Sequence, residues 1–308
     1  MHECNQKDAF ALPLGAKIRV KELVEACGGG ANNTAVGLSR LGCDAAFEGV
    51  LGSDQWGEKL IDNMRREGVN TESITIVEGE VTSFSIILSG INGERVILYE
   101  AGTNEHLHDV TFDKDMLTSM DWIYLNHIQE DSCVIQDDIV EILVSDPETG
   151  LTWNPGGCQI GMGLTSKNNR LLLGTTNLLL LNKQEALGFT KEQTIEDAIR
   201  TLLKAGVQNV AITDGGRGTV ASDGHEIFHC PVVPNIAIVD TTGAGDAFGT
   251  GVTWGLLQGM SLPNALKTGS INAASVVGAI GAQPALLHDT EITTRLEAID
   301  LEVSIHSL

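Results

Sequence analysis

The sequence is poor in basic and aromatic residues. It has 19 lysines and arginines against 41 aspartates and glutamates, which gives a formal net charge of −22, and only 4% of its residues are aromatic. A nucleic-acid binder needs a basic face for the phosphate backbone, and this composition does not supply one. We therefore expect no nucleic-acid partner.

Paired cysteines and long apolar runs are also lacking. The six cysteines include no CxxC pair, so we expect reduced thiols rather than disulfides or a zinc site. Residues 247–266 and 268–287 carry no charge, but Gly, Ser, Asn, Gln or Pro interrupt both, which suits buried helices better than membrane spans. These features predict a cytoplasmic protein with no membrane partner.

Short apolar runs alternate with amphipathic stretches along the middle and C-terminal parts of the chain. The order is DWIYLNH, DDIVEILV, GLTWNP, NLLLLN, TIEDAIRTLLKAG and NVAITDGG. Continuous apolar strands separated by helices indicate a parallel sheet covered on both faces. Ligands of such sheets bind beyond the carboxyl ends of the strands.

One segment departs from this alternation. SFSIILSGINGERVILYE contains two β-rich runs joined by Asn92-Gly93, which predicts an antiparallel hairpin. The hairpin is either an ordinary surface element or a lid over a site. With FALPLGAKIRV near the start of the chain, it predicts a flap of two or three strands.

The stretch DTTGAGDAF, residues 240–248, combines glycines with two acids. We expect NIAIVD to be a strand, followed by a turn and a helix whose N-terminal amides at Gly243, Ala244 and Gly245 can bind an anion. Asp246, in the first helical turn, suits a base that takes a proton from an attacking hydroxyl. An ordinary helix-N-terminal acid is the alternative interpretation.

Five motifs together resemble the ribokinase-like, or pfkB-type, family of carbohydrate and nucleoside kinases. They occur in the family's order across nearly the whole chain: GGGANNTAVGLSRLG, GVLGSDQWG, NKQE, TDGGRG and DTTGAGDAF. The resemblance implies a three-layer α/β/α core with a mostly parallel sheet and a small β lid. It implies lid segments 1–27 and 74–103, and a nucleotide- and substrate-binding core of residues 28–73 and 104–308.

The same resemblance implies an ATP-dependent kinase. Asp246 corresponds to the base, and Gly243, Ala244 and Gly245 to the anion hole for the transferred phosphoryl group. Asn182 and Glu185 correspond to the pair that organises Mg²⁺ and its waters, although an Asn and a Glu three residues apart also suit a helix-capping box. The further ATP-binding positions that the resemblance implies are Thr213, Gly215, Gly218 and Asn272.

Acceptor and cation positions follow from the resemblance as well. Gly28, Gly29, Asn33 and Asn104 correspond to residues that contact the acceptor. Relatives hold a monovalent cation such as K⁺ with the loop that corresponds to Asp240 and Thr242, although Asp240 also suits a simple turn cap. Lids of this family often pair between subunits, so we expect a homodimer.

The chain departs from the family near its start. Relatives begin with an apolar strand and an acid that binds the acceptor, whereas MHECNQKDAFALPLGAKIRV contains no such strand. The usual first core strand is thus expected to be missing. We predict a sugar kinase, with two alternatives: an adenosine-like nucleoside kinase, which the few aromatic residues disfavour, or an ATP- and sugar-binding homologue with impaired catalysis. A Rossmann-type oxidoreductase is disfavoured because GGGANN lacks the GxGxxG spacing.

Overall fold

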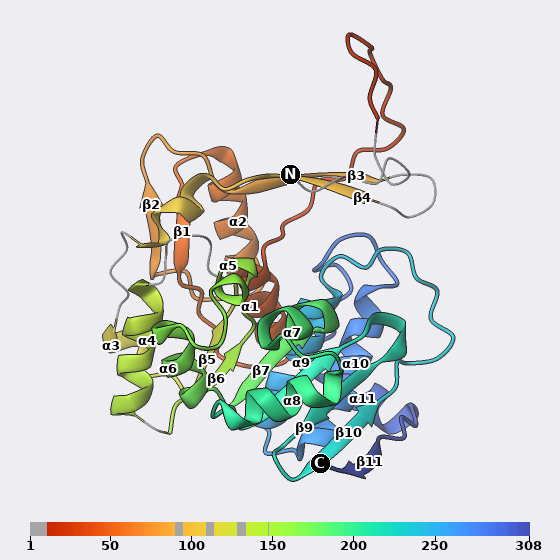
Figure 1. Cartoon of the computed structure of the whole chain (residues 1–308). Helices are drawn as coiled ribbons and strands as arrows, with labels where there is room; N and C mark the ends of the chain where they lie inside the picture. Colours follow the sequence, from red (N-terminus) through yellow and green to blue (C-terminus); the bar gives the residue numbers. More distant parts are fainter. Residues whose placement is uncertain (1–10, 90–94, 109–113, 128–133, 147) are drawn as a thin grey trace.

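The computed structural model describes residues 11–89, 95–108, 114–127, 134–146 and 148–308 (Figure 1). The α-helices are α1 (Gly30–Arg40), α2 (Gln55–Arg66), α3 (Lys114–Leu117), α4 (Val134–Ser145), α5 (Gly157–Met162), α6 (Lys167–Thr175), α7 (Lys183–Thr190), α8 (Ile195–Lys204), α9 (Ala244–Leu257), α10 (Leu262–Val276) and α11 (Asp289–Ala298). The strands are β1 (Gly49–Gly52), β2 (Ile74–Val77), β3 (Phe84–Ser89), β4 (Arg95–Glu100), β5 (Trp122–Leu125), β6 (Gly150–Trp153), β7 (Leu178–Asn182), β8 (Asn209–Thr213), β9 (Thr219–Ser222), β10 (Glu226–Cys230) and β11 (Ser304–Ser307). Two 3₁₀ helices are η1 (Gly102–His108) and η2 (Gly215–Arg217).

The main sheet has seven strands in the order β11-β10-β9-β8-β7-β6-β5. Strands β5 to β8 are parallel, as the alternation of apolar runs and helices predicts. Strands β9, β10 and β11 add an antiparallel edge that the sequence pattern did not indicate. The carboxyl ends of β5 to β8 therefore lie along one edge of the sheet, where ligands of such folds bind.

Strand β7 explains why the domain has three layers. Its run of leucines is buried on both sides: Leu179 and Leu181 belong to the core formed with α4, α6, α7 and α8. Leu178 and Leu180 point the other way, into the core formed with α9 and α10. Figure 1 shows α7 and α8 on one side of the sheet and α9 and α10 on the other. The predicted three-layer α/β/α fold is confirmed.

Strands β1 and β2 form a separate parallel sheet beside α1 and α2. Among the described residues no strand joins β1 to β5, so the two parallel sheets are not continuous. Side chains cover part of β1: the Thr103 hydroxyl donates to the Val50 carbonyl at 3.2 Å, and the Gly52 N–H donates to Thr82 Oγ1 at 2.9 Å. That the usual first core strand of the family is missing from this chain remains a prediction.

The β3–β4 hairpin projects from the domain (Figure 1). Its strands pair antiparallel from Phe84 opposite Glu100 to Ser89 opposite Arg95, while the Asn92-Gly93 turn lies outside the described residues. Residues 11–27 contain no strand and reach α1 from the side of the hairpin. The division into lid and core remains a prediction.

The expectation of a strand at NIAIVD was wrong. Residues 235–240 form no strand, and both Ile238 and Val239 are more than half exposed. The backbone N–H groups of Val239 and Asp240 both donate to the Val277 carbonyl, which lies in no strand. An apolar run without a neighbouring strand cannot form a ladder, so the segment is a loop that leads into α9.

None of the described helices is long and apolar enough to cross a membrane. The four described cysteines, Cys27, Cys43, Cys158 and Cys230, are free thiols.

Helices α1 and α9 approach closely at one glycine. A Cβ atom on Gly37 would lie 2.8 Å from Thr250 Cγ2, so only glycine lets the two helices meet at this distance. One helical turn earlier on each helix lie Asn33 and Asp246, whose side chains are hydrogen-bonded at 2.8 Å. The Gly37–Thr250 contact thus sets the spacing of the helices that carry the predicted site.

We predict that Gly37→Ala destabilises the protein because the new methyl group overlaps Thr250. Overpacking of this kind costs about 1–3 kcal/mol. Thermal unfolding of Gly37→Ala and of Gly37→Ala/Thr250→Ala measures the effect, and the double variant should recover most of the loss. The control is Gly174→Ala in α6, where a Cβ meets nothing within 4 Å. Equal loss in the single and double variants would contradict the packing account.

Candidate active site

The N-terminus of α9 forms the centre of the predicted site. Gly243 caps the helix with φ 77°, and a Cβ atom there would lie 2.3 Å from the Cβ of Ala282, so glycine is required twice over. The N–H groups of Gly243 and Gly245 have no partner among the described residues, whereas the Ala244 N–H donates to the Thr241 carbonyl at 3.3 Å. Unpaired amides at a helix N-terminus favour an anion.

Asp246 lies in the first turn of α9, at the end of the glycine-rich loop. Its Oδ2 atom accepts a hydrogen bond from Asn33 Nδ2 at 2.8 Å. Burial raises the pKa of Asp246 above its ordinary value, while the Asn33 hydrogen bond and the electrostatic effect of His127 act in the opposite direction. A desolvated carboxylate with a raised pKa is a stronger base than one in water.

The carboxyl end of β5 contributes residues that the motif comparison missed. Asn126 donates through Nδ2 to Thr34 Oγ1 at 2.9 Å, and its buried Oδ1 atom has no partner among the described residues. The Tyr124 hydroxyl lies against Gly249 of α9, and burial, together with the negative charge of Asp246, raises the pKa of this tyrosine. The run DWIYLNH did predict a strand ending here, so its last residues were detectable as site candidates.

A second part of the same sheet edge holds a pocket of about 460 Å³. It lies where β7 and β8 end, and it brings together the NKQE and TDGGRG motifs, whose first residues are 31 positions apart in the sequence. Asp214 holds Arg217 through two hydrogen bonds of 2.7 Å and Lys183 through an ion pair of 3.3 Å, and these contacts lower its pKa. The lining residues are Asn182, Lys183, Gln184, Leu187, Thr213, Asp214 and Gly215.

Asn182 and Glu185 form a complete capping box at the start of α7. Asn182 Oδ1 accepts the Glu185 N–H at 2.9 Å, and Glu185 Oε2 accepts the Asn182 N–H at 2.8 Å. The capping alternative is therefore correct as a description of the structure. These hydrogen bonds leave the Oε1 atom of the half-buried Glu185 without a partner among the described residues. A carboxylate oxygen beside a pocket is suited to binding a hydrated Mg²⁺.

The other predicted nucleotide positions differ in their surroundings. Gly215 has open space around its Cα and lines the pocket, whereas Gly218 packs against the Cys230 carbonyl, 2.3 Å from where a Cβ would be. Asn272 is fully buried: its Nδ2 donates to the Ala247 carbonyl at 2.8 Å, and its Oδ1 accepts the Leu287 N–H at 3.1 Å. The carboxamide of Asn272 links α10 to α9 and has no surface left for a nucleotide.

The predicted cation loop is closed by its own hydrogen bonds. Asp240 Oδ1 accepts both the N–H and the hydroxyl of Thr242, at 2.9 and 2.7 Å, and its Oδ2 accepts the Gly281 N–H at 3.1 Å. This geometry is the turn-capping alternative. No group of three or more metal-binding side chains occurs among the described residues. A monovalent cation at Asp240 and Thr242 remains a prediction.

The predicted acceptor residues gather at the N-terminus of α1, apart from one. Gly28 and Gly29 are exposed and directly precede α1. Asn33 lies near the start of α1 and donates a hydrogen bond to Asp246. Asn104, in η1, instead donates to the Tyr99 hydroxyl of the hairpin at 3.1 Å. The structure thus brings Gly28, Gly29 and Asn33 to the site and places Asn104 at the base of the hairpin.

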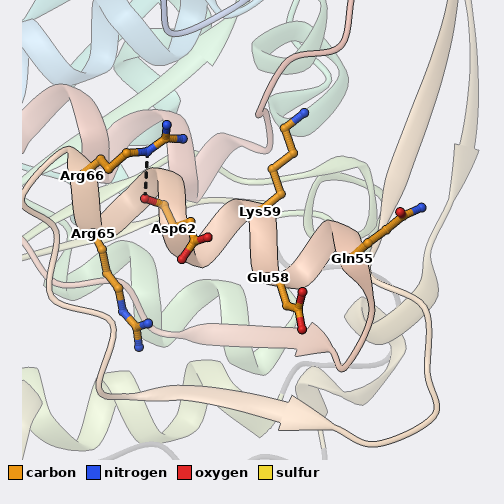
Figure 2. Close-up of a pocket in the computed structure, with 6 residues that line it drawn as sticks. All are labelled: Gln55, Glu58, Lys59, Asp62, Arg65 and Arg66. Carbon is orange, nitrogen blue, oxygen red and sulfur yellow. Dashed lines mark hydrogen bonds between the residues drawn. The ribbon is translucent and has the colours of Figure 1, made fainter.

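Another pocket, of about 560 Å³, lies along α2, whose first residues are the end of the GVLGSDQWG motif (Figure 2). All six lining residues come from this one helix, and acidic and basic side chains are mixed along it. Arg66 Nε donates to the Asp62 carbonyl at 3.2 Å, as the dashed line in Figure 2 shows. Such a mixed-charge helix face has the character of solvated surface.

The model of the pfkB family of carbohydrate kinases matches residues 3–289. The chain belongs to this family. The pfkB kinase is 31% identical over 256 residues to an uncharacterized sugar kinase of Archaeoglobus fulgidus, a match covering 82% of the chain and 98% of the relative.

Solved structures share the fold of this pfkB kinase. The Arabidopsis thaliana ribokinase complexed with ribose and ATP has a TM-score of 0.81 at 22% identity, covering 92% of this chain and 91% of that one. The Burkholderia thailandensis nucleoside kinase in complex with inosine has a TM-score of 0.80 at 19% identity, covering 93% and 92%. A ribokinase solved with ribose and a nucleoside kinase solved with inosine thus share this fold to nearly the same degree.

We predict that Asp246→Asn stabilises the pfkB kinase at neutral pH. Folding raises the pKa of Asp246 above its ordinary value of 3.8. The free energy of unfolding therefore falls as the pH rises from about 3.8 through the pKa that Asp246 has in the folded protein, because the buried carboxylate becomes ionised over this range. Thermal unfolding should show the gain at pH 7 and no gain below about pH 3.8. The control is Asp289→Asn, which removes an exposed first-turn acid of α11. A lower melting temperature for Asp246→Asn at pH 7 would contradict the burial of this charge.

Proposed function

We propose that the protein transfers the γ-phosphoryl group of ATP to a hydroxyl of a sugar, with Asp246 as the general base. The observation that carries the proposal is the placement of a desolvated carboxylate in the same helical turn as the unpaired N–H groups of Gly243 and Gly245. Such a site provides an acceptor for the proton of the attacking hydroxyl next to donors for the phosphoryl oxygens.

In this mechanism, the acceptor hydroxyl lies beside Asp246, with Asn33 orienting the carboxylate through the 2.8 Å hydrogen bond. The hydroxyl oxygen forms a bond to the γ-phosphorus while the bond to the bridging oxygen of ADP breaks. The hydroxyl proton moves to an Asp246 Oδ atom. The N–H groups at the start of α9 stabilise the equatorial oxygens, so the protein contributes mainly positioning and charge neutralisation.

The pocket at the ends of β7 and β8 is proposed to hold ATP. Asn182, Thr213 and Gly215 line it, and Glu185 is proposed to hold Mg²⁺ through water. When bound, Mg²⁺ would neutralise charge on the ATP phosphates. Lys183, held by Asp214 at 3.3 Å, adds positive charge at the same pocket. K⁺ at the Asp240–Thr242 loop is a further proposal and would act by holding that loop.

A sugar is the proposed acceptor, with a nucleoside as the alternative. The buried Asn126 Oδ1 has no partner among the described residues, and it would lie 2.9 Å from a Cβ on Gly30; Asp246 Oδ1 would lie 3.5 Å from the same point. Two oxygen acceptors that close together suit a ligand with several hydroxyls. A nucleoside base would need an aromatic platform, for which the exposed Phe84 and Tyr99 of the hairpin are candidates.

The β3–β4 hairpin is proposed to act as a lid and to pair with a second copy of the chain. Ile86 and Leu98 oppose each other on one face, and Ile87 and Ile97 on the other, and all four are between 42% and 52% exposed. An isolated two-stranded sheet with two apolar, exposed faces is marginally stable in water. A homodimer that buries these side chains would order the lid, which excludes water from the reaction.

We predict acceptor-dependent consumption of ATP with at least one member of a panel of pentoses, hexoses, phosphosugars and nucleosides. Asp246→Asn should lower kcat by about 10²–10⁴-fold, the usual contribution of a general base, with little change in ATP affinity. A coupled ADP assay and calorimetric titration of ATP measure the two quantities. Turnover retained in Asp246→Asn would contradict the assignment. ATP binding without transfer to any acceptor would favour the catalytically impaired homologue.

We also predict that Glu185→Gln raises the Mg²⁺ concentration needed for half-maximal activity. A glutamine can still accept the Asn182 N–H and so keeps the capping box, but it lacks the charge that attracts a divalent cation. The control is Glu196→Gln, in the first turn of α8. A Mg²⁺ dependence identical to that of the unmodified protein would show that Glu185 serves only as a helix cap.

A further inference from the structure

Three side-chain amides form a directed chain of hydrogen bonds that ends at Asp246. Asn63 Nδ2 donates to Gln283 Oε1 at 2.8 Å, Gln283 Nε2 donates to Asn33 Oδ1 at 3.2 Å, and Asn33 Nδ2 donates to Asp246 Oδ2 at 2.8 Å. Gln283 and Asn33 are 6% and 4% exposed, so water cannot readily replace these bonds. We call this chain of Asn63, Gln283, Asn33 and Asp246 the amide relay.

The charge of Asp246 fixes the direction of the amide relay. An ionised carboxylate can only accept, so Asn33 must present its NH₂ group to Asp246 and its oxygen to Gln283. Gln283 must then donate to Asn33 and turn its own oxygen toward Asn63. Each carboxamide would lose a partner if it were flipped, and a buried unpaired polar group costs about 1–3 kcal/mol.

The loop that carries Gln283 is fixed independently of the relay. Arg40 donates through Nη1 to the carbonyls of Gln283 and Leu286, at 2.7 and 3.1 Å, and pairs with both carboxylate oxygens of Glu67. This salt bridge holds the pKa of Glu67 below its ordinary value, so the anchor persists at neutral pH. Gln283 is thus presented to Asn33 on a rigid backbone.

The same loop also touches the glycine-rich turn of the proposed phosphoryl site. The Gly281 N–H donates to Asp240 Oδ2. Ala282 packs against Gly243 so closely that a side chain on residue 243 would not fit. Three consecutive residues therefore contact the cation loop, the helix cap and the residue that orients the base. None of the five sequence motifs includes them.

We propose that Gln283 is a positioning residue for the catalytic base: by donating to Asn33 Oδ1 it keeps the NH₂ group of Asn33 directed at Asp246. The catalytic part of this proposal rests on the proposed role of Asp246 as the base. Hydrogen bonds in series polarise one another, so the relay strengthens the last bond, which favours the ionised form of Asp246. Without Gln283, the Asn33 carboxamide is free to rotate and this stabilisation weakens.

The test is a titration of Asp246 by NMR, followed through its ¹³Cγ resonance in protein labelled at aspartate and assigned with Asp246→Asn. Gln283→Met, which keeps the length of the side chain but removes both polar atoms, should raise the pKa of Asp246, and Asn33→Ala should raise it as well. The double variant should match Asn33→Ala alone, because Gln283 acts only through Asn33. The other described titratable groups that act on Asp246, Tyr124 on β5 and His127 after it, are unchanged in all variants.

Two further variants keep the test decisive. Asn169→Leu removes another fully buried carboxamide, whose bonds go only to the carbonyls of Gln159 and Gly163, and it should leave the Asp246 titration unchanged. Asn63→Ala removes only the first donor of the relay and should give a smaller upward shift, which tests the proposal if Gln283→Met does not fold.

An unchanged Asp246 titration in Gln283→Met or Asn63→Ala, or a further shift of the double variant beyond Asn33→Ala, overturns the proposal. Because the titration needs no substrate, it is independent of the kinase assay. An upward shift in a protein that lacks turnover would refute the proposed function and keep the relay.

Discussion

The hydrogen bond between Asn33 and Asp246 is the contact on which the site depends. It joins residues 213 positions apart and connects α1, beside the small β1–β2 sheet, to α9 on the main sheet. The contact exists because Gly37 lets α1 approach Thr250 of α9, one turn further along both helices. The interaction that orients the proposed base is therefore a consequence of helix packing.

The electrostatics of the site follow from the same packing. Burial between the helices raises the pKa of Asp246, while the start of α9 offers unpaired amides a few ångströms along the chain. The Asp246 carboxylate repels a phosphate, whereas the N–H groups in the same helical turn attract one. The two groups can serve one reaction if the acceptor hydroxyl lies between the carboxylate and the phosphoryl group. The parallel strands β5 to β8 then bring the proposed nucleotide pocket to the same edge of the sheet.

Much of this arrangement could be predicted from the sequence, because its signals are local. Continuous apolar runs indicated β5 to β8, and the spacing of DTTGAGDAF placed Asp246 in the first turn of a helix. The NIAIVD run misled, since an apolar pattern does not reveal whether a partner strand is present. The antiparallel edge strands β9 to β11, the unpaired oxygen of Asn126 and the contacts of Gln283 depend on tertiary neighbours. Asn33 and Gln283 are 250 positions apart, a distance over which periodicity carries no information.

The most direct measurement of the central claim is a crystal structure with ADP, Mg²⁺ and fluoroaluminate, which imitates the phosphoryl group in transit. The account predicts that the fluoroaluminate lies within hydrogen-bonding distance of the Gly243 and Gly245 N–H groups, with a water or acceptor oxygen between aluminium and Asp246. A fluoroaluminate bound away from the start of α9, or an attacking oxygen out of reach of Asp246, would contradict the assignment of the base.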